Sequence, residues 1–267
     1  MFRIGLCQMK GSFDKNESMA KAEDFIRQAA KGGAEVISLP EMWNCPYANE
    51  YFREYAETAD GAAVSFMSKL AEELGIYLIG GSIPELEGEK VYNTSFSFDR
   101  KGRIIGRHRK VHLFDIDVKG GIRFMESDTL TPGDELTVLD TEFGRIGVAI
   151  CYDVRFPEWH RKMALAGAKL IVLPAAFNMT TGPAHWDLSM RARALDNQVY
   201  FAANSPARDE DGPYVAYGNS CIADPWGSFI AHADEKECVL YGDIDFEKVE
   251  AVRQQLPLLK HRREELY

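Results

Sequence analysis

The chain has 267 residues, of which 46% are hydrophobic, and its formal net charge at pH 7 is −10. This length suits one large α/β domain over residues 1–267, with enough apolar residues for a substantial core. An acidic surface repels phosphate backbones and anionic lipids, so we expect neither nucleic acid nor membrane as a general partner. No segment approaches the roughly 20 apolar residues of a membrane span, and the start, MFRIGLCQMK, has no apolar run of signal-peptide length.

Short apolar runs alternate with amphipathic stretches along the chain. Runs typical of buried strands cover residues 2–9, 35–39, 76–81, 145–151, 169–173, 199–204 and 219–224. Hydrophobic residues at helical spacing predict helices over 16–31, 62–74 and 156–167, and Pro157 lies near the start of the last, where a missing N–H costs nothing. This alternation predicts a layered α/β fold.

The sequence also resembles itself in three places, in the same order. RIGLCQM (3–9) matches RIGVAIC (145–151), GGAEVISLPEMW (32–43) matches AGAKLIVLPAAF (166–177), and YNTSFSFDRKGRII (92–105) weakly matches YGNSCIADPWGSFI (217–230). We infer two similar halves within the domain, at about 1–110 and 145–240. If the two halves pack sheet on sheet, the result is a helix–sheet–sheet–helix sandwich.

The chain has five cysteines and no CxxC pair. They are Cys7, Cys45, Cys151, Cys221 and Cys238. Because their number is odd and their spacing wide, we interpret them as reduced thiols of a cytoplasmic protein, not as disulfides or metal ligands.

Glu41 follows the predicted strand EVISL and Pro40. Ligands of open α/β sheets bind beyond the carboxyl ends of the strands. Desolvation there raises the pKa of a glutamate toward the range useful for proton transfer. The matching position of the other half is Ala175, so the scaffold itself does not require a carboxylate. The alternative interpretation is a solvated glutamate in a turn.

Lys110 lies in the stretch GRHRKVHLF. Its basic neighbours suggest a solvated patch, but the apolar residues Val111, Leu113 and Phe114 indicate that the chain enters the core here. A lysine ammonium in a pocket stabilises a developing oxyanion.

Cys151 ends the apolar run RIGVAIC, and charged residues follow at once. Core packing is the ordinary role of a buried cysteine. A thiolate nucleophile instead needs a base and a positive neighbour. Glu41 and Lys110 would supply these, and the backbone N–H of Tyr152 would point into the same space.

A Cys/His pair is the competing arrangement. In it the base is His112, two residues after Lys110, or His185. A lone histidine more often forms a structural hydrogen bond.

The motifs LPEMW, RKVHLFD and ICYDVRFPE resemble those of the Glu–Lys–Cys triad in the nitrilase superfamily of carbon–nitrogen hydrolases, which would assign Glu41, Lys110 and Cys151 to catalysis. The resemblance covers nearly the whole chain. It implies a four-layer αββα sandwich, assembly as a homodimer or higher homo-oligomer, and chemistry without a metal or other cofactor. A second glutamate often lies near this triad, and RFMESDTLTPG places Glu126 there.

Within the superfamily the chain looks most like the omega-amidase branch. The likeness is carried by CPYANEYF (45–52), AFNMTTGPAHW (176–186), ALDNQVYFAANSPARD (194–209) and VRQQLPLLKHRREELY (252–267). It implies hydrolysis of the terminal amide of 2-oxoglutaramate or 2-oxosuccinamate to ammonia and a 2-oxo dicarboxylate. Neighbouring branches cleave deaminated glutathione, N-carbamoyl amino acids or nitriles on the same scaffold. A non-catalytic scaffold protein is the alternative from another class.

The substrate implied is a small amide with a carboxylate at its far end. Arg155, four residues after the candidate nucleophile, is the predicted clamp, because a guanidinium binds a carboxylate through two hydrogen bonds. Its alternative is an ion pair with Asp153 or Glu158. Tyr47 is a candidate hydroxyl donor to the substrate and Phe177 a candidate pocket wall, with simple packing as the alternative for both.

Overall fold

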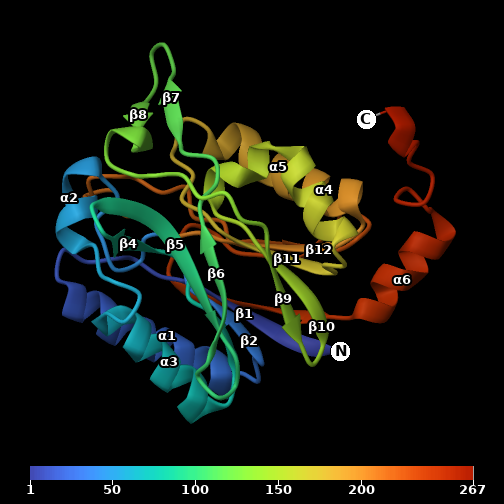
Figure 1. Ribbon diagram of the computed structural model, residues 1–267, viewed down its shortest axis with the longest axis horizontal. Coiled ribbons are helices and arrows are strands. Elements are labelled where there is room, and N and C mark those ends of the chain that lie inside the picture. Colours follow the sequence, from blue (N-terminus) through green and yellow to red (C-terminus); the bar gives the residue numbers. More distant parts are fainter. Residues whose placement is uncertain (267) are drawn as a thin grey trace.

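The structure, a computed structural model, describes residues 1–266 and contains two β-sheets packed face to face between two layers of helices (Figure 1). The first sheet has seven strands. In order across the sheet they are β15 (Cys238–Ile244), β1 (Phe2–Gln8), β2 (Val36–Ser38), β3 (Tyr77–Ile79), β5 (Lys90–Phe98) and β4 (Ile83–Glu87), with β6 (Ile104–Arg109) also paired to β5. Because β1, β2 and β3 are parallel, their carboxyl ends meet at one edge.

The second sheet repeats this plan with six strands. Their order is β14 (Phe229–His232), β13 (Cys221–Ala223), β12 (Tyr200–Asn204), β11 (Leu170–Pro174), β10 (Gly144–Val148) and β9 (Thr137–Thr141). Here β10, β11 and β12 are the parallel strands.

Helices form the two outer layers. The first sheet is covered by α1 (Lys15–Lys31) and α3 (Ala62–Leu74), and the second by α4 (Pro157–Leu165) and α5 (Gly182–Asn197) (Figure 1). The remaining elements are α2 (Asn49–Tyr55), α6 (Phe246–Gln255), the hairpin β7 (Asp115–Asp117) and β8 (Arg123–Met125), and the 3-10 turns η1 (Glu126–Asp128), η2 (Cys151–Arg155) and η3 (Glu264–Leu266). None of the helices in residues 1–266 is both long enough and apolar enough to cross a membrane.

The central core lies between the sheets. Ile4 and Leu6 of β1 pack in one apolar cluster with Val148, Leu170 and Val172 of the second sheet. Two further clusters bury the opposite faces of the sheets under the helices. Strands buried on both faces explain why the sequence shows continuous apolar runs here and not an alternating pattern.

The internal repeat is confirmed by the topology. In each half a strand, a helix and a parallel strand follow one another, as β1–α1–β2 and as β10–α4–β11. The weaker third match corresponds to the hairpins β5–β6 and β13–β14, which extend the two sheets beyond β3 and β12. The predicted four-layer αββα sandwich is therefore correct.

Local signals fix the helix ends. The Asp14 side chain accepts hydrogen bonds from the N–H groups of Asn16 and Glu17 and so caps α1. Gly75 ends α3 with φ of 62°, a left-handed conformation that glycine adopts without a steric penalty. The three helices expected from the sequence all form, within one or two residues of the predicted limits.

Candidate active site

Glu41, Lys110 and Cys151 each follow a strand end, of β2, β6 and β10 respectively. All three are buried, and the Glu41 and Lys110 side chains are fully enclosed. The Lys110 Nζ lies 2.9 Å from Glu41 Oε1 and 2.9 Å from Glu126 Oε2. The structure therefore brings the lysine between two carboxylates from different segments of the chain.

Three donors and a shared hydroxyl surround the Glu41 carboxylate. Its Oε1 accepts hydrogen bonds from Lys110 Nζ (2.9 Å) and Asn93 Nδ2 (2.9 Å), and the Tyr47 hydroxyl, whose one proton points mainly to Glu126, lies 3.2 Å away. Its Oε2 accepts one from the Ala176 N–H at 2.7 Å, which crosses to the second sheet. Because an ionised carboxylate only accepts hydrogen bonds, this set of donors holds the Glu41 carboxylate in one orientation.

The second carboxylate, Glu126, opens η1 and is fully buried. It accepts hydrogen bonds from the Tyr47 hydroxyl (2.7 Å), Lys110 Nζ (2.9 Å) and the Phe114 N–H (2.7 Å). Burial raises the pKa of Glu126. Burial alone would lower the pKa of Lys110, but the charges of Glu126 and Glu41 raise it well above its usual value, so the ammonium form persists.

Cys151 begins η2 with φ of +42°, in the left-handed region. A residue other than glycine held there costs on the order of 1–3 kcal/mol, and such strain concentrates at functional sites. Met42, directly after Glu41, has φ of +50°. The N–H of Tyr152 has no acceptor among residues 1–266, so it is free to meet an oxyanion, as the residue after a strand-end nucleophile does.

The surroundings of Cys151 favour the thiol over the thiolate. Burial raises its pKa, the charge of Glu41 raises it further, and Lys110 opposes both, leaving it well above the usual value. Such a thiol needs a base to remove its proton as it attacks. The candidate histidine bases contact other groups: His112 Nδ1 lies 2.7 Å from Asp153 Oδ1, and His185 Nδ1 lies 3.2 Å from Arg155 Nη1.

Asp153 connects η2, the turn that begins at Cys151, with β6 and the residues that follow it, including Lys110. Its carboxylate contacts two histidine rings, His112 Nδ1 at 2.7 Å and His108 Nε2 at 3.1 Å. It also accepts hydrogen bonds from the backbone N–H groups of His112 and Ile150, both at 3.0 Å.

Arg155 forms no ion pair with Asp153, Glu158 or any other acidic side chain in the described part of the chain. Its guanidinium lies 4.9 Å from the centre of the Phe177 ring and 5.8 Å from that of Tyr152. The Phe177 ring is buried. The Arg155 guanidinium at the end of η2 therefore lies beside the aromatic ring of Phe177.

Tyr47 has a contact that the sequence did not indicate. Its hydroxyl donates to Glu126 and reaches Glu41, and its ring packs on Tyr214 with centroids 4.6 Å apart. The structure thus places Tyr47 in the carboxylate network. Direct contact with the substrate stays a prediction, as do the catalytic roles of the other site residues.

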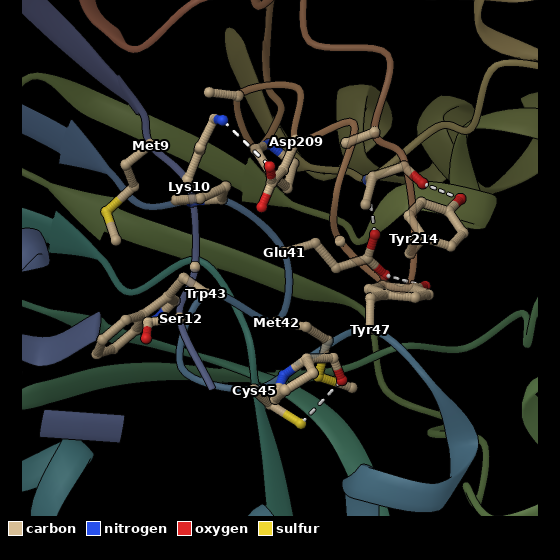
Figure 2. Close-up of a pocket in the computed structure, with 18 of the residues that line it drawn as sticks. Met9, Lys10, Ser12, Glu41, Met42, Trp43, Cys45, Tyr47, Asp209 and Tyr214 are labelled. Carbon is tan, nitrogen blue, oxygen red and sulfur yellow. Dashed lines mark hydrogen bonds and ion pairs between the residues drawn. The ribbon is translucent and has the colours of Figure 1, made fainter. Parts of the chain in front are cut away.

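A cavity of about 110 Å³ borders Glu41 (Figure 2). It is lined by segments that follow β1, β2, β11 and β12, including Met9, Trp43, Cys45, Tyr47 and Tyr214. Within residues 1–266 no cluster of three or more histidine, cysteine or acidic side chains has the arrangement of a metal site.

Several residues of the site were not expected from the sequence. Asn93 donates to Glu41 from within β5, and Ala176 and Phe114 act through their backbone N–H groups. The Tyr214 hydroxyl donates to the Ala176 carbonyl oxygen at 2.6 Å.

Comparison with known proteins places the chain in a family. The model of the carbon–nitrogen hydrolase family matches residues 3–254, and the chain belongs to that family. Omega-amidase NIT2 of Xenopus tropicalis is 51% identical over 266 residues, which are 100% of this chain and 96% of that protein. Omega-amidase NIT2 of Homo sapiens is 49% identical with the same coverage. The predicted resemblance to the nitrilase superfamily and its omega-amidase branch is confirmed.

Solved structures agree. Nit3 of Saccharomyces cerevisiae, a member of branch 10 of the nitrilase superfamily, has a TM-score of 0.91 at 42% identity, covering 98% of this chain and 96% of that one. A mutant amidase from Nesterenkonia sp. AN1 has a TM-score of 0.82 at 26% identity, covering 99% and 95%. That structure shows covalent addition of the acetamide moiety of fluoroacetamide at its active-site cysteine. This chain is therefore a hydrolase of carbon–nitrogen bonds, with a small amide as substrate.

Proposed function

We propose that this hydrolase is an omega-amidase that releases ammonia from the terminal amide of 2-oxoglutaramate or 2-oxosuccinamate. The observation that carries the proposal is the buried contact of Lys110 with Glu41 and Glu126, 2.9 Å from each, beside the strained turn that begins at Cys151. The choice of amide rests on the full-length similarity to omega-amidases.

In the first half-reaction Glu41 takes the thiol proton while the Cys151 sulfur bonds to the amide carbon. The carbonyl electron pair moves to oxygen, and Lys110 Nζ and the Tyr152 N–H stabilise the oxyanion. Loss of one such donor typically costs ~2.7–4 kcal/mol of barrier. The oxyanion then collapses, the carbon–nitrogen bond breaks, and Glu41 gives its proton to the departing nitrogen. Ammonia and a thioester result.

In the second half-reaction water replaces ammonia. Glu41 takes a proton from this water as its oxygen bonds to the thioester carbon. The carbon–sulfur bond then breaks, the sulfur regains the proton, and the 2-oxo dicarboxylate leaves. Glu126 and Tyr47 keep Lys110 and Glu41 in place through both steps, because each contacts a charged member of the network.

Arg155 is the proposed partner of the substrate's distal carboxylate, and Phe177 the wall against which the substrate carbon chain packs. The guanidinium lies beside the Phe177 ring and has no acidic partner within residues 1–266, which leaves its charge available. A guanidinium with two N–H groups in a fork matches a carboxylate in geometry and charge.

We also propose that the protein acts in the cytoplasm as a homodimer or higher homo-oligomer. The five cysteines described are all free, as in a reducing compartment. Leu165, Leu188 and Leu195 are exposed on α4 and α5, and exposed apolar groups of this kind favour an interface between subunits. Light scattering of the purified protein tests the assembly, and a monomer at all concentrations would contradict it.

Ammonia release from 2-oxoglutaramate tests the activity. It should be compared with release from deaminated glutathione, an N-carbamoyl amino acid and a simple nitrile, for the wild type and Cys151→Ala. We expect turnover of the 2-oxo amide alone, lost in the variant. If another compound is hydrolysed instead, the protein belongs to a different branch of the superfamily. If none of the compounds is hydrolysed, the result favours a non-catalytic scaffold protein.

A further inference from the structure

The cavity borders Glu41 but not Cys151. Across the second sheet β10 is followed by β11 and then β12, and in the first sheet β2 lies next to β1. Cys151 follows β10. Glu41, which follows β2, accepts a hydrogen bond from the N–H of Ala176, which follows β11. The cavity continues from Glu41 to Lys10, which follows β1, and to Ala207, which follows β12. The Ala207 N–H donates to the Met9 carbonyl, which joins these last two segments. Neither Cys151 nor Arg155 lines the cavity.

We propose that this cavity is a rear port through which water reaches Glu41 and ammonia leaves, separate from the side by which the amide enters. The inference rests on the thioester route of the proposed function. It deepens that route by assigning water and ammonia a path of their own.

The acyl-enzyme creates the need for such a port. Once the thioester has formed, the acyl chain extends from Cys151 toward Arg155 and Phe177 and fills that side. Ammonia is released next to Glu41, which donated its proton, and the hydrolytic water must take the same position. The side of Glu41 that faces the cavity is the side that the acyl chain leaves open.

The cavity has room for small molecules, and its lining is mostly apolar with polar side chains at its two ends. A volume of about 110 Å³ has room for a few water molecules, and each of them needs polar partners. Glu41 borders the inner end, where its carboxylate is enclosed by its hydrogen-bond donors. At the outer end Lys10 Nζ and Asp209 Oδ1 form an ion pair of 3.2 Å, with 39% of each side chain exposed (Figure 2). An amide seated in the cavity would not meet the nucleophile, because Cys151 does not line it.

Two tyrosines connect the cavity with the nucleophile. Tyr47 and Tyr214 both line the cavity, and their rings pack with centroids 4.6 Å apart. Both also lie close enough to Cys151 for a thiolate charge there to raise their pKa, after the larger effect of burial. The two rings therefore lie between the part of the cavity near Lys10 and Asp209 and the surroundings of Cys151.

Filling the cavity at its mouth tests the port. Gly11 lines the cavity, and a Cβ at this position would meet only the Trp43 carbonyl oxygen, at 3.4 Å, so Gly11→Leu adds bulk without a backbone clash. The probes are two activated esters, the mono-p-nitrophenyl ester of glutaric acid and p-nitrophenyl acetate. With either, acyl transfer to Cys151 releases p-nitrophenol in a burst, and the steady rate reports hydrolysis of the thioester by water. The glutaryl group fills the substrate side, whereas the acetyl group leaves it open.

We expect Gly11→Leu to keep the burst rate with both esters within twofold. Hydrolysis of the glutaryl thioester should slow about tenfold, so that the acyl-enzyme accumulates in intact-protein mass spectra, while hydrolysis of the acetyl thioester changes less than threefold. Lys236→Leu, on an exposed loop that does not line the cavity, is the matched control and should change neither. Gly212→Val fills the mouth from the other side and replaces Gly11→Leu if that variant loses stability.

Unchanged hydrolysis of the glutaryl thioester in both filled variants would overturn the port, and so would equal slowing with both esters, which indicates general damage. The test is independent of the amide substrate. A wild type that hydrolyses the esters but releases no ammonia from 2-oxoglutaramate contradicts the proposed omega-amidase activity and leaves the port standing.

Discussion

Asp153 Oδ1 lies 2.7 Å from His112 Nδ1, and this contact joins the two segments that carry Cys151 and Lys110. Asp153 is two residues after Cys151, and His112 is two residues after Lys110. The other carboxylate oxygen of Asp153 contacts His108, two residues before Lys110. One buried carboxylate therefore sets the position of the thiol relative to the ammonium, although it touches neither.

The first prediction concerns this positioning role. Asp153→Asn keeps the shape of the side chain but removes its charge and exchanges one acceptor for a donor. We expect kcat to fall about tenfold or more, equivalent to ~1.4 kcal/mol of barrier, with KM changed less than threefold, because substrate contacts stay intact. Steady-state kinetics with 2-oxoglutaramate measure both constants.

Asp99→Asn is the matched control for Asp153→Asn. Asp99 is another buried carboxylate, which accepts hydrogen bonds from Lys101 and Arg103 in the turn between β5 and β6. It should lower the melting temperature and leave kcat within twofold. A loss of kcat that merely follows the loss of stability in both variants contradicts the positioning role.

The second prediction is a dependence of stability on pH. Burial alone would raise the pKa of Asp153, but hydrogen bonds from His108 and His112 lower it overall. The Asp153 carboxyl of the unfolded chain therefore binds a proton at a higher pH than that of the folded chain does. The stabilisation that Asp153 contributes is complete above about pH 5. It declines as the pH falls through about 4, the ordinary range of an aspartate pKa, and below. Urea unfolding between pH 6.5 and 3.5 should show a steeper loss for the wild type than for Asp153→Asn. Parallel curves would contradict this contribution.

The third prediction concerns the hydroxyl between the two carboxylates. Tyr47→Phe removes the donor that lies 2.7 Å from Glu126 and 3.2 Å from Glu41. A hydrogen bond to a charged group contributes about 1.5–3 kcal/mol, so we expect kcat/KM to fall by roughly 10- to 100-fold. The loss should appear in kcat, with KM changed less than threefold, because the hydroxyl contacts the two carboxylates. A loss of activity that only follows a loss of stability would contradict this role.

The fourth prediction separates binding from chemistry. Arg155→Ala should lower kcat/KM for 2-oxoglutaramate by roughly 10- to 100-fold, the loss of a charge-assisted hydrogen bond. A small neutral amide such as propionamide has no carboxylate to bind, and its slow turnover should change less than threefold. Mixtures of the two amides, assayed with one enzyme preparation, provide an internal control. Equal losses on both would show that Arg155 acts on the reaction centre and not on the distal carboxylate.

The arrangement of the halves was predictable because each half repeats a strand, a helix and a strand with the same spacing. Helix α5 was not predicted. Its buried residues include Trp186, Met190 and Ala194 at helical spacing, but the apolar Leu188 between them in the sequence is 70% exposed, which obscures the pattern. The helix also begins at Gly182, a residue more typical of turns. Tertiary packing against β12 and β13, not local pattern, decides its conformation.

The positions of Glu41, Lys110 and Cys151 at one site were predictable because each follows a strand end in the sequence. Their supports were not. Asn93 points to Glu41 from the middle of β5, and Ala176 and Phe114 contribute backbone N–H groups, which almost every residue carries. Tyr214 lies in a long connection after β12, where no local pattern indicates that it approaches the site.

The last prediction is that removing the base makes the thiol more reactive toward a simple alkylating agent. Burial and the charge of Glu41 raise the pKa of Cys151. Glu41→Gln removes that charge while Lys110 remains, so the thiolate fraction at pH 8 should rise, and alkylation by iodoacetamide should accelerate at least threefold although ammonia release is lost. Mass spectrometry of the alkylated peptide against time, at pH 7 to 10, measures the rate and the apparent pKa, and Cys151→Ala identifies the background from Cys45 and Cys238. Slower alkylation in Glu41→Gln would instead mean that the carboxylate withdraws the thiol proton even in the absence of an amide.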